Sequence, residues 1–460
     1  MIEISRENVI RYNISGPRYT SYPTADRFVD AFGADQYIDS LVHRRSGINA
    51  NNMHTSLYVH LPFCASICYY CACNKIITKQ YDRSVAYMHL LEKELKLIVS
   101  HLGTCQKLTQ LHFGGGTPTY YKDNDLIILI NLLKQNFVWE ENGEFSIEID
   151  PRTVDPDRLR SLKQLGFNRI SLGVQDFEPI VQKAVNRVQS FDLVQQLTVA
   201  STEIGFKSIN FDLIYGLPFQ TIESFSRTLD LVIRLKPNRI ALYAYAHLPQ
   251  KFKPQRKIHT EDLPIADIKI NMLMMSINKF EDAGYIYIGM DHFALPDDSL
   301  AIAKQKGTLQ RNFQGYSTQS DMDIIPLGIS AIGKVGAVYC QNTKDITEYA
   351  DLLTMGKLPI VKGLVLTRDD LLRRTIIMGL MCQGIIHFDL IETNFLINFR
   401  NYFSREIELL NNFELEKIIV IKSNAIEVTT KGWYFVRAIA MVFDRYLRLD
   451  TDRSKFSKII

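Results

Sequence analysis

The sequence lacks the features of a membrane, secreted or nucleic-acid-binding protein. Its most apolar stretches, such as Leu126–Leu133, are well short of the ~20 apolar residues that cross a bilayer. The start, Met1–Asn13, has neither the basic nor the apolar region of a secretory signal. A net charge of +3 gives no overall field that would attract nucleic acid. We therefore expect a cytoplasmic protein with no membrane span and no nucleic-acid partner.

Cysteine is also scarce, and its distribution excludes a disulfide framework. Four of the seven cysteines lie between Cys64 and Cys73, and the other three are scattered. This arrangement is typical of a reducing compartment. Such a tight cluster of thiols indicates a metal site.

The spacing within the cluster is C-x-x-x-C-x-x-C, formed by Cys64, Cys68 and Cys71 after an apolar strand. Three thiolates can hold three irons of a [4Fe–4S] cube and leave the fourth iron open. An open iron can chelate S-adenosylmethionine, and an electron passed through it can yield a 5′-deoxyadenosyl radical. The alternative is a closed zinc site that also uses Cys73, but structural zinc sites usually divide their ligands between two separated pairs. The spacing therefore favours a radical S-adenosylmethionine enzyme.

From about Thr55, short apolar strands alternate with longer segments of helical period, such as Tyr81–Leu102. This alternation predicts an α/β fold with a parallel sheet made of β/α units. At 460 residues, the chain is long enough for one large domain and a smaller one. The six expected strands are Ser56–Phe63, Leu108–Phe113, Glu144–Ile149, Asn168–Leu172, Ser208–Ile214 and Arg239–Tyr245.

The pattern changes after Thr367 to helical segments, followed by Ile418–Val428 with a polar turn at Lys422–Asn424 and then another helix. We expect a small, helix-rich C-terminal domain. Its element order is similar to that of a winged helix, so a metal-stabilised DNA-binding regulator is an alternative. The segment lacks a dense basic face, which argues against that alternative.

Functional side chains are expected at the carboxyl ends of the strands, where barrel-like folds place their sites. Glu148 and Asp212 are strand carboxylates that form either a core ion pair or hydrogen bonds to a cofactor. Arg187 either caps a helix or binds a ligand, and His60 is expected to be a packed or orienting residue rather than a ligand. The strand-end segments are Cys64, Gly114–Pro118, Asp150–Pro151, Gln175, Gly216–Pro218 and His247–Pro249.

Several longer motifs occur in a characteristic order along the chain. With them, the sequence resembles the oxygen-independent coproporphyrinogen III oxidase (coproporphyrinogen dehydrogenase) family, from about residue 8 to the C-terminus. The resemblance implies a six-unit partial (β/α) barrel in residues 55–365, an N-terminal arm in residues 1–54 and a C-terminal domain in residues 366–460. The motifs are Gly16–Thr24, Tyr58–Cys64, Cys68–Lys75, Phe113–Pro118, Gly289–Phe293, Phe313–Gln319 and Leu366–Asp370.

The resemblance also implies which residues bind cofactors. Cys64, Cys68 and Cys71 would hold the [4Fe–4S] cluster, and Cys73 would not. Two S-adenosylmethionine molecules would bind beside the cluster. The molecule on iron would contact Tyr58, Gly115, Glu148 and Ile332, and the second would contact Gly116, Thr117, Gln175, Arg187, Asp212 and Ala246.

The implied activity is the oxygen-independent oxidative decarboxylation of two propionates of coproporphyrinogen III, which gives the vinyl groups of protoporphyrinogen IX in haem biosynthesis. Removing hydrogen from an unactivated propionate carbon requires a carbon radical, which agrees with the cysteine motif. Arg18 and Arg311 are candidate ligands of the substrate carboxylates, or else ordinary surface arginines. An electron donor and an electron acceptor are also required, and we expect a monomer.

Two relatives of the same superfamily are the competing interpretations. A haem chaperone binds haem without decarboxylation, but that branch typically lacks a fourth cysteine such as Cys73 and a segment such as Gly16–Thr24. A haem-degrading radical enzyme would open or methylate the ring instead. Analysis of the product separates these activities.

Overall fold

The structure is a computed structural model that describes residues 6–12, 14–47, 53–319, 322–448, 450 and 456. Residues 1–5 and 13 of the start lie outside the described residues. The chain forms two compact units, each discontinuous in sequence. The sheet unit comprises Phe28–Met272 and Met322–Val365, and the arm unit comprises Met1–Arg27, Leu273–Asp321 and Leu366–Ile460.

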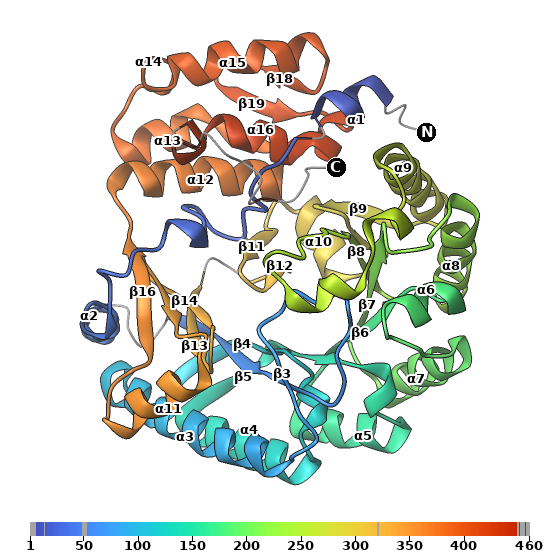
Figure 1. Cartoon of the computed structure of the whole chain (residues 1–460). Coiled ribbons are helices and arrows are strands. Elements are labelled where there is room, and N and C mark those ends of the chain that lie inside the picture. Colours follow the sequence, from blue (N-terminus) through green and yellow to red (C-terminus); the bar gives the residue numbers. More distant parts are fainter. Residues whose placement is uncertain are drawn as a thin grey trace. The chain divides into compact units, whose positions relative to one another are not determined.

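The sheet unit is built around six strands, each parallel to the next. They confirm the six predicted strands and the predicted α/β fold. Helices follow one another along the outer side of these strands (Figure 1). In chain order the elements are β1 (His54–Leu61), α3 (Asp82–Leu102), β4 (Gln106–Gly115), α4 (Asp123–Asn136), β5 (Phe137–Ile149), α5 (Pro156–Leu165), β6 (Arg169–Gln175), α6 (Pro179–Ala184), α7 (Phe191–Ile204), β7 (Ser208–Tyr215), α8 (Ile222–Leu235) and β8 (Arg239–Ala244).

Local sequence explains where these helices begin and end. Asp155 caps α5 by accepting a hydrogen bond from the Arg158 backbone N–H, and Gly166 ends the helix in the left-handed region. Thr221 forms a capping box with Ser224 at the start of α8. These short-range contacts position the loops at the carboxyl ends of the strands.

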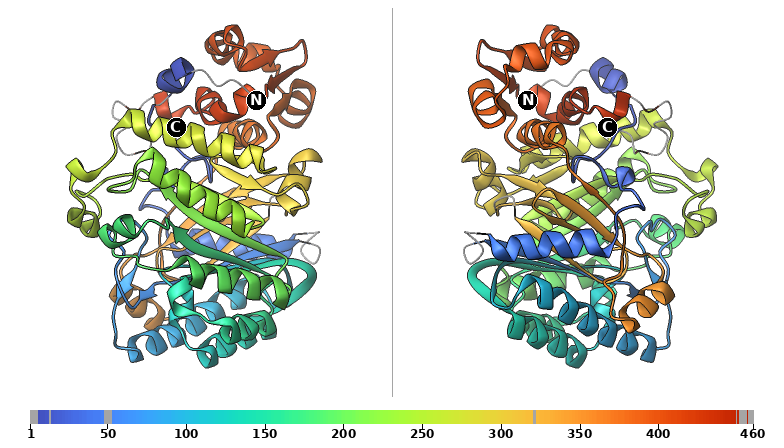
Figure 2. Two further views of the ribbon diagram at one scale, coloured as in Figure 1. Left: turned by 90° about the vertical axis from the view of Figure 1, so that its right-hand side faces the viewer. Right: turned by 90° about the vertical axis from the view of Figure 1, so that its left-hand side faces the viewer.

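Four further strands extend the sheet beyond β1 and were not predicted from the sequence. The first is parallel to β1, and the others continue antiparallel. Pro326 and Gly333 lie within them, and both residue types argue against a strand when read from sequence. Helix α2 (Ala34–Ser46) lies beside these strands (Figure 2). They are β13 (Asp323–Leu327), β14 (Ile332–Val335), β15 (Val338–Asn342) and, after α11 (Ile346–Thr354), β16 (Ile360–Val365).

The arm unit combines N-terminal, central and C-terminal segments. Strands β18 and β19 pair antiparallel across the predicted turn at Lys422–Asn424, which confirms the predicted hairpin. Tyr12 stacks on Phe413, with ring centroids 5.0 Å apart. The elements are α1 (Arg6–Tyr12), the end of α9 (Ala266–Asp282), β9 (Ile286–Gly289), β10 (His292–Ala294), α10 (Ser299–Gln305), β11 (Gln310–Asn312), β12 (Gly315–Ser317), α12 (Arg368–Gln383), β17 (Ile385–His387), α13 (Phe388–Phe395), α14 (Phe399–Tyr402), α15 (Ser404–Leu415), β18 (Ile419–Ile421), β19 (Ala425–Val428) and α16 (Val436–Val442).

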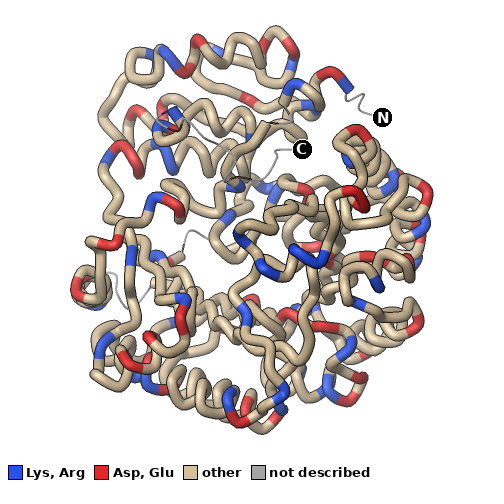
Figure 3. Tube along the Cα trace, in the orientation of Figure 1, with Lys and Arg blue, Asp and Glu red and all other residues tan. Residues whose placement is uncertain are grey.

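Acidic and basic residues are interspersed along the trace of both units (Figure 3). Among the described residues, no helix combines the length and the apolar character that crossing a bilayer requires.

Candidate active site

The cysteine loop is anchored to the sheet unit at both ends and along its length. Strands β2 (Phe63–Cys64) and β3 (Ile76–Ile77) pair in parallel and close its base. The Tyr69 N–H donates to the Val185 carbonyl at 2.9 Å, and the Tyr70 carbonyl accepts from Gln255 Nε2 at 3.0 Å. Both tyrosine rings pack against a buried hydrophobic cluster. The loop backbone is therefore held in place by the protein itself.

The thiols of the loop lie in different environments. Thr117 Oγ1 donates to Cys64 Sγ at 3.2 Å, and burial raises the pKa of Cys64 to about 11. A hydrogen bond with Cys73 lowers the pKa of Cys71 to about 6, and the same bond raises the pKa of Cys73. Among the described residues, no three His, Cys, Asp or Glu side chains converge on one metal-ion position. A cube does not require such convergence, because each thiolate binds a different iron.

Two arginines meet the third thiol and share one carboxylate. Arg152 Nη2 lies 3.8 Å and Arg187 Nη1 lies 3.7 Å from Cys68 Sγ. Both guanidinium groups also pair with Asp150 Oδ2, each at 2.7 Å. Burial opposes ionisation of Asp150, but the hydrogen bond from Arg152 and the charge of Arg187 outweigh it and lower the pKa. Arg187 thus pairs with Asp150, Cys68 and the Gly173 carbonyl rather than with a helix end, and its buried Nε has no hydrogen-bond partner among the described residues.

A row of polar side chains crosses the face of the parallel strands. The Tyr58 and His112 rings stack with centroids 5.8 Å apart, and His112 Nε2 lies 3.2 Å from Glu148 Oε1. On β7, Asp212 accepts hydrogen bonds from Ser171 Oγ at 2.8 Å and Asn210 Nδ2 at 2.9 Å. Alternate residues of neighbouring strands face the same side, so the strand register produces this row.

The pKa values of the two carboxylates in this row, Glu148 and Asp212, shift in opposite directions. Burial opposes ionisation of Glu148, but the hydrogen bond from His112 outweighs it, and the net pKa is lowered. Burial raises the pKa of Asp212 to about 6. Neither pairs with Lys or Arg in a described contact, and the contact of Glu148 with His112 is an ion pair only when that histidine is protonated.

The glycine turn after β4 belongs to the same site. The Gly115 N–H donates to Glu148 Oε2 at 3.2 Å. Its φ of 112° favours glycine, and a Cβ there would lie 2.5 Å from the His60 ring. A Cβ on Gly116 would lie 2.4 Å from the Pro62 carbonyl oxygen. His60 contacts the Asn74 carbonyl through Nε2 at 2.9 Å and Tyr58 Oη through Nδ1 at 3.1 Å, which is the expected orienting role.

The remaining predicted residues divide between the two units. Gln175 ends β6 with a φ of 65°, in the left-handed region. The Ala246 carbonyl accepts from Gln255 Nε2 at 3.2 Å, and Ile332 begins β14 without a described contact to the other predicted residues. All predicted cofactor residues lie in the sheet unit, whereas Arg18 and Arg311 lie in the arm unit.

Comparison with known proteins agrees with this geometry. The profile of the radical SAM superfamily matches residues 58–232, and that of the HemN C-terminal domain matches residues 366–435. The oxygen-independent coproporphyrinogen III oxidase of Pseudomonas aeruginosa is 47% identical over 98% of this chain and 97% of its own length. The solved structure of coproporphyrinogen III oxidase from Escherichia coli is 41% identical, covers 96% of this chain and 98% of its own, and has a TM-score of 0.90.

The chain belongs to the oxygen-independent coproporphyrinogen III oxidase family. Membership in this radical SAM family implies a [4Fe–4S] cluster and S-adenosylmethionine. The residues fit both groups. Three thiols lie on one anchored loop, and Arg187 keeps a buried donor without a hydrogen-bond partner among the described residues.

Several residues of this oxidase site were missed from the sequence. They are Arg152, which shares the Asp150 carboxylate with Arg187, and His112, Ser146, Ser171 and Asn210 in the polar row. Strand alternation could have identified the last four, because a polar residue at every second strand position marks one face. Nothing local pairs Asp150 with Arg187, which follows a later helix.

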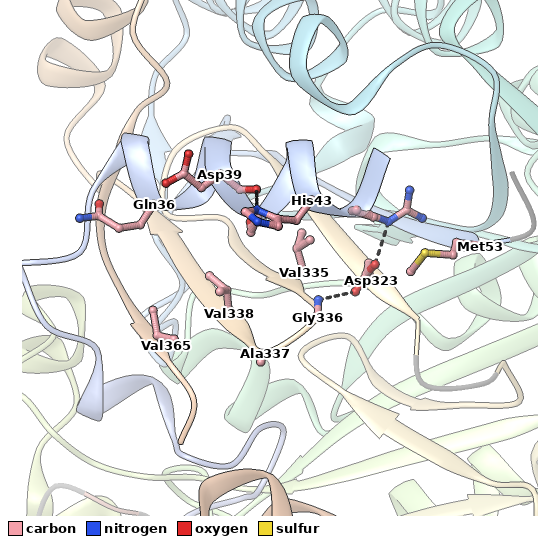
Figure 4. Close-up of a pocket in the computed structure, with 12 residues that line it drawn as sticks. Gln36, Asp39, His43, Met53, Asp323, Val335, Gly336, Ala337, Val338 and Val365 are labelled. Carbon is pink, nitrogen blue, oxygen red and sulfur yellow. Dashed lines mark hydrogen bonds and ion pairs between the residues drawn. The ribbon is translucent and has the colours of Figure 1, made fainter. Parts of the chain in front are cut away.

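A separate pocket of about 430 Å³ lies between α2 and the strands of the antiparallel extension (Figure 4). Arg44 Nε and Asp323 Oδ2 form an ion pair of 2.7 Å at its wall. None of its lining residues belongs to the oxidase site described above.

Proposed function

We propose that this chain catalyses the oxygen-independent oxidative decarboxylation of two propionates of coproporphyrinogen III to the vinyl groups of protoporphyrinogen IX, in haem biosynthesis. The observation that carries the proposal is the near full-length similarity to oxidases of this name, at 47% and 42% identity in the Pseudomonas aeruginosa and Escherichia coli relatives. The anchored three-cysteine loop beside the polar row supports it.

The cluster and S-adenosylmethionine, when bound, supply a carbon radical able to remove a hydrogen atom from a propionate side chain. The protein excludes water from these groups and orients them. We propose that Cys64, Cys68 and Cys71 hold the cluster and that the glycine turn and Glu148 receive the amino acid part of the iron-bound cofactor. Tyr58 and Ile332 complete that contact.

We propose that a second S-adenosylmethionine binds beside the first, at Gly116, Thr117, Gln175, Arg187, Asp212 and Ala246. The unpaired Arg187 Nε and the raised pKa of Asp212 support this assignment, because both groups gain from a charged or hydrogen-bonding ligand. Arg18 and Arg311 are proposed contacts of the substrate carboxylates. The chain is proposed to act as a monomer in the cytoplasm, with an external electron donor and acceptor.

Substitution of residues assigned to the second S-adenosylmethionine tests the two-cofactor arrangement directly. We expect Asp212→Ala and Arg187→Ala to bind one S-adenosylmethionine per chain by equilibrium dialysis, where the unaltered protein binds two. Cluster iron should stay near the unaltered level and decarboxylation should fall strongly. Loss of iron in the Asp212 variant would contradict the assignment.

The activity itself is tested by anaerobic cluster reconstitution followed by incubation with reductant, S-adenosylmethionine and coproporphyrinogen III. We expect a tricarboxylic intermediate, protoporphyrinogen IX and 5′-deoxyadenosine. Haem binding without decarboxylation would identify the protein as a chaperone instead.

A further inference from the structure

The hairpin that joins β9 and β10 holds a carboxylate in an unfavourable backbone conformation. His292 pairs with Gly289, so Met290 and Asp291 form a two-residue turn, with φ values of 47° and 63°. Turns with two positive φ angles favour glycine and asparagine, and methionine there is strained. A Cβ on Gly289 would lie 2.4 Å from Tyr316 Oη, so the ring packs directly on the hairpin. Strain of this kind is typical of binding sites.

Arg311 lies on β11, opposite Tyr316 on β12, and is 8% exposed. Its guanidinium carbon lies 4.5 Å from the centroid of the Tyr316 ring. Two of its nitrogens, Nε and Nη1, are buried and have no hydrogen-bond partner among the described residues. Buried donors are nearly always paired, so this side chain lacks the partners that a purely structural arginine would have.

Two more arginines of the arm unit complete the cluster. Arg437 on α16 is 2% exposed and donates to the carbonyls of Pro17 and Gly16, which precede Arg18. Arg18 Nη2 lies 3.9 Å from Asp291 Oδ2. Burial and the nearby Arg18 and Arg311 lower the pKa of Arg437 to about 9.

The titratable groups of this cluster shift one another's pKa values. Burial raises the pKa of Asp291, although Arg18, Arg437 and Arg311 oppose the shift. Burial and Arg311 lower the pKa of His292 to about 3, so this histidine is uncharged at neutral pH. Arg18, Arg437 and Arg311 all act on the Asp291 carboxylate, and the two buried donors of Arg311 that lack a partner among the described residues match an added acidic group.

We propose that Arg311, Arg18 and Arg437 form a carboxylate-binding site in the arm unit, in which Asp291 positions the guanidinium groups. This inference rests on the proposed function and names the propionates of the tetrapyrrole as the ligand. A guanidinium fixed over an aromatic ring presents its donors in a set direction, which suits a planar carboxylate. The strained hairpin is retained because it places Asp291 among the three arginines.

The binding test uses the full chain and two porphyrins that differ only in charge. Quenching of porphyrin fluorescence is measured with coproporphyrin III and with an uncharged porphyrin that carries ethyl groups in place of the propionates. We expect Arg311→Gln to weaken coproporphyrin III binding about 10- to 100-fold. Binding of the uncharged porphyrin and of S-adenosylmethionine should be unchanged, and Arg405→Gln, an exposed arginine of the same unit, should resemble the unaltered protein.

Thermal unfolding separates a ligand site from a structural role. Because Arg311 leaves buried donors unpaired, Arg311→Met should unfold at the same or a higher temperature than the unaltered protein without ligand. A clear drop in its unfolding temperature, or an unchanged affinity of Arg311→Gln for coproporphyrin III, would overturn the inference.

Failure of the site and failure of the proposed function give different results. If the unaltered protein binds the porphyrin through Arg311 but forms no protoporphyrinogen, the proposed function fails and the site stands. If it forms product and Arg311→Gln behaves identically, only the site fails.

Discussion

Cys71 and Cys73 stand two positions apart, yet their thiols differ in acidity because they share one hydrogen bond. That bond lowers the pKa of Cys71 to about 6 and raises that of Cys73. The Lys75 charge adds to the lowering at Cys71, since Lys75 Nζ donates to the Cys71 carbonyl at 3.0 Å. A thiolate is the form that binds iron, so these pKa directions favour the prediction that Cys71 is a cluster ligand and Cys73 is not.

Replacing each of the two cysteines with serine should therefore give different proteins. Cys71→Ser should lose most of its cluster iron and all 5′-deoxyadenosine formation, because a serine oxygen is a poor ligand for a sulfur cube. Cys73→Ser should keep the cluster, even if its activity falls. Iron and sulfide analysis after anaerobic reconstitution distinguishes them, and equal losses in both variants would make Cys73 a ligand.

Arg152 offers a second test at the level of a single side chain. Its guanidinium lies 3.8 Å from Cys68 Sγ and is neutralised only in part, because Asp150 also pairs with Arg187. Positive charge near a ligating sulfur stabilises the reduced cluster. Arg152→Gln should lower the midpoint potential by on the order of 50 mV, equivalent to about a tenfold change for a one-electron couple.

Redox titration followed by electron paramagnetic resonance measures this potential. Arg158→Gln is the matched control, because that arginine donates to the Thr153 carbonyl and not to a cysteine. A potential that moves equally in both variants would show that Arg152 has no special influence on the cluster.

Among the secondary-structure elements, α3 is joined to the turn between β13 and β14 by one buried acid. Glu94 accepts hydrogen bonds from the Gly328 N–H at 2.7 Å, from Asn342 Nδ2 at 2.6 Å and from the Tyr349 hydroxyl. Burial raises its pKa to about 7 in spite of these donors. These contacts join α3 to the turn between β13 and β14 and to Asn342 of β15.

Stability should consequently depend on the pH through Glu94. Its folded pKa lies above the unfolded value near 4.5, so its contribution is fully present below that value and is lost as the pH rises through about 7. Between pH 5 and pH 8 the unfolding free energy of the unaltered protein should fall, relative to Glu94→Gln, by about 3 kcal/mol. Urea unfolding at several pH values measures the difference. Glu92→Gln, a half-exposed neighbour on α3, should show no such divergence. An equal pH dependence of the unaltered protein and Glu94→Gln would refute the assignment.

At the scale of the whole molecule, the arm unit is assembled from three distant segments. Tyr19, which is 1% exposed, donates to Asp444 Oδ2 at 2.9 Å, and Tyr316 Oη donates to the Met381 carbonyl at 3.1 Å. Arg437 binds the carbonyls of Gly16 and Pro17. The C-terminal segment thus has buried groups whose partners lie elsewhere in the sequence.

We predict that residues 366–460 do not fold on their own. Without the N-terminal and central segments, Asp444 and Arg437 lose buried partners and the apolar surface around Phe413 is exposed. The isolated fragment should show no cooperative thermal transition by circular dichroism and poor dispersion in a proton–nitrogen NMR spectrum. A cooperative transition comparable to that of the full chain would show that this segment is autonomous.

Much of the fold follows from local patterns in the chain. The six parallel strands, helix α3 and the hairpin around Lys422–Asn424 agree with the sequence prediction, because their apolar periods and turn residues act over short distances. Strands β13–β16 were missed, since Pro326 and Gly333 weaken the strand pattern there and pairing with distant strands overrides it.

The sequence by itself determined the chemistry of this protein, because three cysteines at a short spacing on one loop are a local arrangement. The longer motifs then led to the correct family. Only the tertiary structure decided which groups meet. Asp150 pairs with Arg152 and Arg187, and Arg18 lies near Asp291. The distances between such side chains depend on strand register and on packing between segments far apart in the chain, so no local pattern encodes them.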